Sequence, residues 1–279
     1  MRIEQVDGVT HVWLRQSWIN DAVSCNERGR HAIVRPTWSI ASDSSALGTA
    51  CHKGIETALN GGEDPFRAAR VEMERLIEEP MRRTLNMSDG KLIEEADRLT
   101  RSWDKTIAPQ MSTWGDPLGI EWTFDVEWTT TTIMDRTVVL HLTGTVDYLT
   151  DKRVVDWKTS GRKYNVRDKQ RNAVQPSVYT AAAVLSGHSR WPADFTYGVM
   201  LRGSDDTQLV PVHRNEHHLA FVLRLVRPLI ATALGLGLDQ PWTLNDTGYL
   251  CSEKWCPWFS ICKGVDLTSA DLSTKEYSN

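Results

Sequence analysis

Long apolar runs are missing from this 279-residue sequence, and its first residues carry no apolar segment of the kind found in secretory signals. We therefore expect no membrane span and no secretory leader, and a cytoplasmic protein. Basic residues are not in excess either, because 32 Lys and Arg stand against 36 Asp and Glu and leave a net charge of −4. Net charge thus gives no indication of nucleic-acid binding, although it does not exclude a local basic groove.

Several motifs are also absent. There is no G-x-x-x-x-G-K-S/T phosphate loop, which argues against a helicase or motor subunit. There is no internal repeat or low-complexity linker, so we expect one domain over residues 1–279. The cysteine count is five, and an odd number argues against a disulfide framework in a cytoplasmic protein. No two cysteines form the C-x-x-C pair that is typical of zinc ribbons.

Hydrophobic periodicity predicts an α/β (α+β) chain. Helical patterns cover residues 17–23, 46–62, 65–79, 91–111, 172–187 and 216–235. Alternating patterns predict strands at residues 120–128, 137–149, 153–160, 195–203 and 207–214, and residues 31–40 are expected to be extended. Helices come first, then a group of strands, then helix, strands and helix. That order predicts a mixed central sheet with helical additions.

Charged residues interrupt two of the predicted strands. Asp147 lies in one, and Asp156 and Lys158 lie in the next, beyond a short turn. Because side chains alternate along a strand, Asp156 and Lys158 share a face, and the turn brings Asp147 beside them. Two carboxylates suit a hard divalent ion, which lowers the pKa of a bound water and polarises a phosphoryl oxygen. The pattern fits phosphodiester hydrolysis, and its alternative is a solvated pair of edge charges joined by a salt bridge.

These residues resemble the central motifs of the PD-(D/E)XK nuclease superfamily, and more closely its RecB-type branch, in which a G-x-x-D strand is followed by D-x-K. Gly144 and Asp147 match the first motif, and Asp156 and Lys158 match the second. The resemblance implies a restriction-endonuclease-like core, with a mixed central sheet flanked by helices. We expect a helical N-terminal part at about 17–113, a nuclease core at about 118–235, and a Cys-rich cluster-binding tail at 249–264 joined to Cys25.

Two further motifs of the branch have matches here. A histidine four residues after a glycine on an upstream helix is matched by Gly48 and His52, which implies a metal ligand through neutral imidazole. The Q-x-x-x-Y motif is matched by Gln175 and Tyr179, whose i, i+4 spacing puts both on one helix face. The resemblance implies that this pair holds the lysine, a phosphate or a base edge and so aligns the strand.

The resemblance also implies a role for each matched residue. One or two Mg²⁺ or Mn²⁺ ions would be held by His52, Asp147, Asp156 and the carbonyl of Trp157. Lys158 would activate the water that attacks the phosphate. The branch frequently has a glutamate upstream of the aspartate strand, and Glu121 is the candidate here, with Glu127 as its competitor. We favour the interpretation that both are simply exposed strand residues.

The cysteines match a subset of RecB-type nucleases that hold a 4Fe–4S cluster, including the CRISPR-associated iron–sulfur exonucleases of the fourth Cas family. One ligand in that subset is near the N-terminus and three are near the C-terminal end. The matching residues are Cys25, Cys251, Cys256 and Cys262. Two features depart from the subset: four residues instead of two separate the second and third ligands, and Asn26 replaces a proline after the first.

Four thiolates suit either a zinc ion or an iron–sulfur cluster. The missing C-x-x-C pairs favour the cluster, whose role would be structural, and zinc stays the alternative. Trp255 and Trp258 would shield the cluster from solvent, and Cys51 is assigned to core packing.

The sequence therefore predicts a metal-dependent DNA nuclease, an exonuclease on DNA ends or single strands, of a bacterial or phage-infected cell. A DNA-contacting segment follows the catalytic strand and contains Arg162, Lys163, Arg167, Lys169 and Arg171, with a solvated charged turn as the alternative. Alternative functions are a non-catalytic DNA-binding or adaptor subunit and a zinc-stabilised DNA-binding protein. Partners in recombination or DNA processing and a homo-oligomer stay open.

Overall fold

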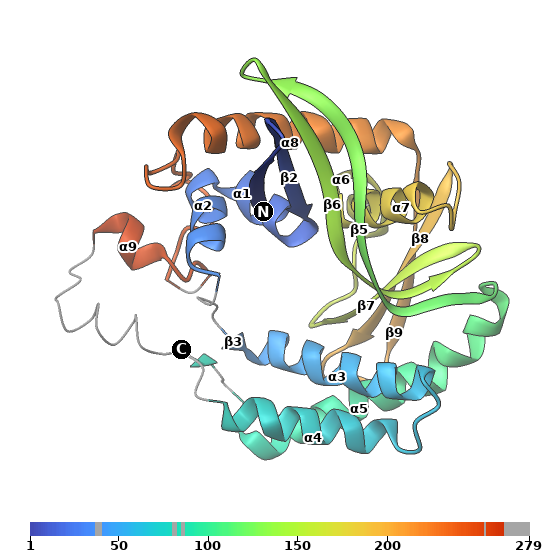
Figure 1. Ribbon diagram of the computed structural model, residues 1–279. Coiled ribbons are helices and arrows are strands. Elements are labelled where there is room, and N and C mark those ends of the chain that lie inside the picture. The colour runs from blue at the N-terminus through green and yellow to red at the C-terminus, as the bar shows by residue number, and fades with distance from the viewer. Residues whose placement is uncertain (37–40, 80–82, 85–86, 254, 265–279) are drawn as a thin grey trace.

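The computed structural model describes residues 1–36, 41–79, 83–84, 87–253 and 255–264 of the chain. Within these residues, a seven-stranded mixed sheet forms the centre of the molecule (Figure 1). Its order is β1-β2-β6-β7-β8-β9, and β5 pairs with β6 outside that path. The strands are β1 Arg2–Val6, β2 Val9–Arg15, β5 Pro117–Ile133, β6 Arg136–Thr150, β7 Arg153–Ser160, β8 Ala193–Leu201 and β9 Thr207–Arg214.

The sheet mixes parallel and antiparallel pairs. β2 runs parallel to β6, and β7 runs parallel to β8. The pairs β1–β2, β5–β6, β6–β7 and β8–β9 are antiparallel. A separate two-stranded sheet joins β3 (Ala41–Ser42) to β4 (Arg83–Thr84). The predicted mixed central sheet is confirmed.

Helices pack against both faces of this sheet. On one face, α1, α7 and α8 share a hydrophobic cluster with the sheet, and on the other, α3, α5 and η1 share a second cluster. Figure 1 shows α8 behind β2 and β6, and the group of α3, α4 and α5 below the sheet. The helices are α1 Gln16–Ser24, α2 Asn26–Val34, α3 Asp43–Leu59, α4 Pro65–Glu78, α5 Asp89–Thr106, η1 Ala108–Thr113, α6 Val166–Asn172, α7 Val174–Leu185, α8 Glu216–Leu236 and α9 Phe259–Lys263.

Local sequence explains where the helices that carry the site begin. α3 starts with a capping box, in which the side chains of Ser42 and Ser45 bind each other's backbone N–H groups. α7 contains Pro176 in its first turn, where backbone N–H groups have no hydrogen-bond acceptor within the helix, so the N–H that proline lacks is not needed. The predicted helices and strands are confirmed as elements, with shifted ends.

Two segments near the N-terminus differ from expectation. β1 and β2 were not predicted. β1 is short and almost wholly exposed, whereas β2 does alternate, with Thr10, Val12 and Leu14 buried, and its signal was missed. Residues 31–34 are helical rather than extended, since α2 packs on α1 through the close approach of Gly29 to Ala22. Residues 37–40 of the same predicted extended segment lie outside the described residues.

One helix of the described residues, α8, is long and apolar enough to span a membrane by length and composition alone. Core helices of soluble proteins pass the same test. In this fold Val222, Val226 and Ile230 of α8 are buried in the cluster on the sheet, and Arg224 and Arg227 interrupt its apolar sequence.

Candidate active site and cysteine cavity

The β6–β7 hairpin opens where Asp147 lies. Backbone pairing between the two strands is confined to Tyr148 with Val155 and Leu149 with Val154. Beyond those pairs the carboxylate of Asp147 connects the two strands, because its Oδ2 accepts a hydrogen bond of 2.6 Å from the backbone N–H of Trp157. Asp147 thus replaces a ladder bond and separates the strands, which leaves room for a bound group between them.

Asp156 and Lys158 lie on one face of β7, as the period of two predicts. The ammonium of Lys158 forms an ion pair with Asp156. On the other side of that carboxylate, Gln175 Nε2 donates a hydrogen bond of 2.6 Å to Asp156 Oδ1. Gln175 therefore holds the carboxylate of Asp156 in place. This contact gives Gln175 a more specific role than the three that the resemblance implies.

His52 reaches this centre from α3. Its Nε2 lies 2.7 Å from the carbonyl oxygen of Trp157, to which it donates, and its Nδ1 lies 3.7 Å from Asp147 Oδ2. Lys158 Nζ also donates to that carbonyl at 3.3 Å. The four predicted metal-ligand positions are therefore brought together.

Glu121 also joins the centre. Ligand atoms of Glu121, His52 and Asp147 all lie within 4.8 Å of one another. Glu121 lies on β5 in the left-handed region, with φ of 49°, a conformation that costs a non-glycine residue about 1–3 kcal/mol and is concentrated at functional sites. Glu121, which the sequence predicts to be a simple exposed strand residue, thus has its carboxylate beside two of the predicted metal ligands.

The glycine of the G-x-x-D motif has a steric reason. A Cβ on Gly144 would lie 2.9 Å from Cζ of Phe124 and 3.5 Å from Cε1 of Tyr179. These two rings meet edge to face, with centroids 5.8 Å apart. Gly144 thus makes room for the ring of Phe124, and Tyr179 of α7 packs against that ring one helical turn after Gln175.

The electrostatics of the centre favour a cation. Burial and the neighbouring Asp156 raise the pKa of Asp147 well above its usual value. Burial and the charge of Lys158 lower the pKa of His52, which keeps its imidazole neutral and able to bind a metal. Burial also raises the pKa of Glu121, with Glu56 and Asp156 adding to the effect. A divalent cation would relieve the repulsion between these carboxylates.

A cleft of about 520 Å³ adjoins the centre, with His52, Lys53 and Glu56 of α3 on one side and Glu72 and Glu121 on the other. On the far side of β7, the predicted DNA-contacting segment forms a loop and α6. Its residues Arg162, Lys163, Arg167 and Arg171 are exposed, whereas Lys169 is half-buried.

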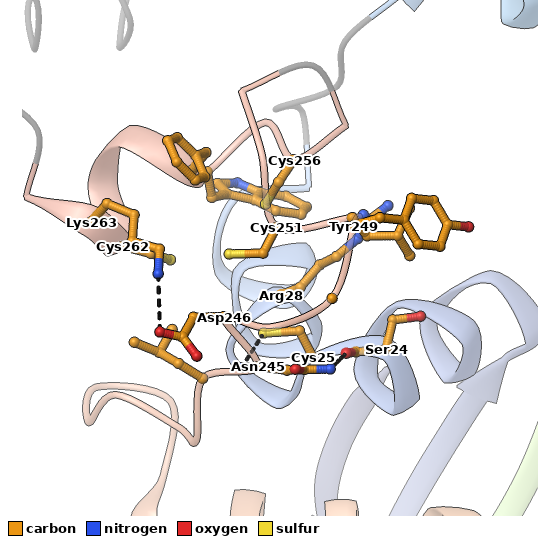
Figure 2. Close-up of a pocket in the computed structure, with 15 residues that line it drawn as sticks. Ser24, Cys25, Arg28, Asn245, Asp246, Tyr249, Cys251, Cys256, Cys262 and Lys263 are labelled. Carbon is orange, nitrogen blue, oxygen red and sulfur yellow. Dashed lines mark hydrogen bonds and ion pairs between the residues drawn. The ribbon is translucent and has the colours of Figure 1, made fainter.

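The four predicted cluster cysteines line a single cavity of about 210 Å³, although they come from opposite ends of the chain (Figure 2). Cys25 lies at the joint of α1 and α2, and its Sγ accepts a hydrogen bond of 3.4 Å from the backbone N–H of Asn245. Burial raises the pKa of Cys262 to about 11. Of the two tryptophans predicted to shield a cluster, Trp258 lines the cavity and is buried, whereas Trp255 is 50% exposed and does not line it.

Ion pairs and hydrogen bonds also hold α2 against the segment that follows α8. Buried Glu27 on α2 forms an ion pair with Arg30 and accepts a hydrogen bond of 2.6 Å from the backbone N–H of Trp242. Arg30 Nη1 donates to the carbonyl of Leu238 at 2.8 Å. Cys51 lies elsewhere, fully buried in the core under α3, as predicted.

Comparison with known proteins bears on the same segments. A family model described as the PD-(D/E)XK nuclease superfamily matches residues 27–263. Among solved structures, the chain is similar to a presumed exonuclease from Eubacterium rectale at 10% identity and a TM-score of 0.55, covering 92% of this chain and 89% of that chain. The structure of SSO0001 matches at 13% identity and a TM-score of 0.34, over 80% of this chain and 85% of that chain. A search of curated proteins gave no match.

Proposed function

This chain belongs to the PD-(D/E)XK nuclease superfamily, and from that we propose that it is a metal-dependent DNA nuclease, an exonuclease on DNA ends or single strands. The observation that supports this proposal most strongly is the convergence of Asp147, Asp156 and Lys158 with His52 and the carbonyl of Trp157. An edge pair of solvated charges, the alternative interpretation, does not explain buried carboxylates held by specific donors.

The residues fit one or two Mg²⁺ or Mn²⁺ ions. Carboxylate and carbonyl oxygens are the ligands that these hard ions prefer, and the site offers Asp147, Asp156, Glu121 and the carbonyl of Trp157, with neutral His52 beside them. Such an ion lowers the pKa of a bound water and offsets negative charge on the scissile phosphate. We add Glu121 to the ligand set that the sequence predicts.

The other side chains of the centre orient the reactants. Lys158 lies where an ammonium can hold the attacking water and stabilise charge that develops on the phosphate. Gln175 keeps the carboxylate of Asp156 in place through its hydrogen bond. Tyr179, whose pKa is raised by burial and by Asp156, stays a neutral donor that can bind the strand.

We propose DNA as the partner because four exposed basic residues follow the catalytic strand directly, and Lys and Arg side chains track phosphates. They are Arg162, Lys163, Arg167 and Arg171.

The test is cleavage of end-labelled single-stranded and double-stranded DNA with Mg²⁺, Mn²⁺ or EDTA. We expect metal-dependent loss of label by the wild type, and a loss of at least 100-fold in rate for Lys158→Ala. Lys152→Ala is the matched control, because Lys152 is exposed at the other end of β7. Full activity of Lys158→Ala would show that the site is wrongly assigned, and DNA binding without cleavage by the wild type would favour the adaptor alternative.

We further propose that the cysteine cavity holds a 4Fe–4S cluster. A zinc ion with Zn–S bonds of about 2.3 Å brings its sulfurs to about 3.8 Å from one another. Among the described residues, Cys262 lies within 4.8 Å of ligand atoms of Glu27 and His31, whereas no such group joins three of the cysteines. The cavity of about 210 Å³ is also several times the volume of roughly 30 Å³ that one water takes up in the liquid. Wide spacing and ample room both favour a cluster over a single ion.

Anaerobic purification tests the cluster. We expect brown protein that contains iron and sulfide, and Cys256→Ala should lose both. Cys51→Ala is the control, because Cys51 lies in the core and lines no part of the cavity. Colourless protein with stoichiometric zinc would contradict the proposal.

A further inference from the structure

Lys169 differs from the other basic residues of its segment because it is half-buried and turned toward the sheet. Its Nζ lies 4.0 Å from the centroid of the Tyr164 ring and 5.3 Å from that of Tyr197. The two rings meet edge to face at 5.7 Å. A cation above aromatic rings is attracted to their faces, so this arrangement holds the ammonium in one place.

That place is beside the catalytic centre. Tyr197 on β8 pairs directly with Asp156 on β7, and paired residues of parallel neighbours point to the same side of a sheet. Burial and the positive charge of Lys158 lower the pKa of Lys169, whereas the more distant carboxylates of Asp156 and Asp168 oppose the change. Two ammonium groups therefore face one site.

Only one of these ammonium groups has a protein counter-ion. Lys158 is paired with Asp156. In the part of the chain that the structure describes, no carboxylate lies within 4.0 Å of Lys169 Nζ, and no side chain accepts a hydrogen bond from it. A half-buried charge without a carboxylate in contact is unfavourable, and an anionic group of a substrate would compensate it.

The backbone at Lys169 is held firmly. Buried Arg214 on β9 donates through Nη2 to the carbonyls of Lys169 and Ala173, both at 3.1 Å. The side chain of Gln170 pairs with the backbone of His213 through two hydrogen bonds, of 3.0 and 3.1 Å. The ammonium thus projects from a helix, α6, whose end is held by these hydrogen bonds, and a binding residue needs such a rigid support.

We propose that Lys169 binds a phosphate of the substrate strand next to the scissile phosphate, and so forms a second phosphate subsite on the α6 side of the centre. This inference rests on the proposed nuclease function. The ligand is a phosphate oxygen, either of an internal phosphodiester or of a terminal monophosphate. This subsite distinguishes the role of Lys169 from that of the exposed basic residues nearby. Those residues would contact the DNA backbone farther from the scissile phosphate, and they are Arg162, Lys163, Arg167 and Arg171.

The experiment measures binding of fluorescent single-stranded oligonucleotides by anisotropy, in EDTA and in Ca²⁺, over a range of salt. We expect Lys169→Met to weaken binding roughly 10- to 100-fold. The slope of log K against log salt should fall by about 0.7, the value for one phosphate on a single strand. Lys169→Arg should restore most of the affinity, and Lys152→Met is the control. Oligonucleotides with and without a terminal phosphate distinguish the two sources of the ligand.

Separate outcomes test the subsite and the nuclease. Equal affinity and salt slope for Lys169→Met and Lys152→Met, with unchanged melting temperatures, would overturn the subsite even if the wild type cleaves DNA. In cleavage assays, Lys169→Met should raise KM more than it lowers kcat, unlike Lys158→Ala. Absence of binding by the wild type in both EDTA and Ca²⁺ would overturn the subsite together with the DNA substrate.

Discussion

Replacement of Arg214 by methionine tests how the turn between α6 and α7 is held. The guanidinium is 1% exposed and donates five hydrogen bonds. Their acceptors are Ser177 Oγ and the carbonyls of Lys169, Gln170, Ala173 and His213, at 2.9–3.1 Å. Four of these five acceptors belong to the end of α6 and the start of α7, which carry Lys169 and Gln175.

Two effects of this substitution oppose each other. Methionine removes a buried charge that has no carboxylate partner among the described residues, and a buried methionine side chain contributes about 1.5–3 kcal/mol to the free energy of unfolding. The loss of the guanidinium leaves several carbonyls without donors, at about 1–3 kcal/mol for each one that water cannot reach. We therefore expect a net loss of about 2–3 kcal/mol, because the unpaired carbonyls outnumber the one relieved charge.

Thermal unfolding by calorimetry measures this loss. At about 2–4 °C per kcal/mol, the melting temperature should fall by about 4–12 °C. Arg214→Lys keeps the charge but has no planar fork, so it should also be destabilised. Limited proteolysis should cut Arg214→Met between residues 161 and 173 faster than the wild type. A melting temperature equal to or above that of the wild type would refute the reasoning, since burial of the unpaired charge would then outweigh its hydrogen bonds.

Two further substitutions test the metal centre and the joint at Cys25. Because burial raises the folded pKa of Asp147 above 3.8, its stabilising contribution is present at low pH and is lost as pH rises through the folded pKa. Asp147→Asn should therefore unfold at a higher temperature than the metal-free wild type at pH 7–8, and the difference should vanish toward pH 4. Mg²⁺ should raise the melting temperature of the wild type only. A difference in melting temperature that does not vary with pH would contradict this explanation. Gly29→Ala places a Cβ 2.4 Å from that of Ala22, so it should lower the free energy of unfolding by about 1–3 kcal/mol and reduce the iron content. Gly90→Ala is the control, because a Cβ there meets nothing within 4 Å. Melting and iron measurements on this control should match those on the wild type.

The sequence predicted the five strands from β5 to β9 because their β-branched and aromatic residues form runs bounded by turn residues. Burial alternates along β9 but is almost continuous along β8. It predicted His52, Asp147, Asp156, Lys158 and Gln175 through the resemblance, and the structure brings these five together. In both cases the information is local in the chain, as a pattern or a short motif.

Other parts of the site depend on distant contacts, which a pattern does not record. Glu121 joins the centre only because its backbone adopts a positive φ. Lys169 points toward the sheet, where its ammonium lies above the rings of Tyr164 and Tyr197. Arg214 had a signal, since it continues the buried phase of Val210 and Val212 along β9. A basic residue at a core position of a strand therefore merits attention in any sequence of this kind.

The pairing of β2 with β6 has a consequence for biosynthesis. Thr10 lies opposite Val138, so the ribosome adds more than a hundred residues before β2 meets its parallel neighbour, roughly 6–25 s at about 5–20 residues per second. Cys25 waits longer still, since the other cysteines of its cavity begin at Cys251. The cavity that these four cysteines line is therefore complete only after almost the whole polypeptide has been synthesised, and the proposed cluster would be inserted after that point.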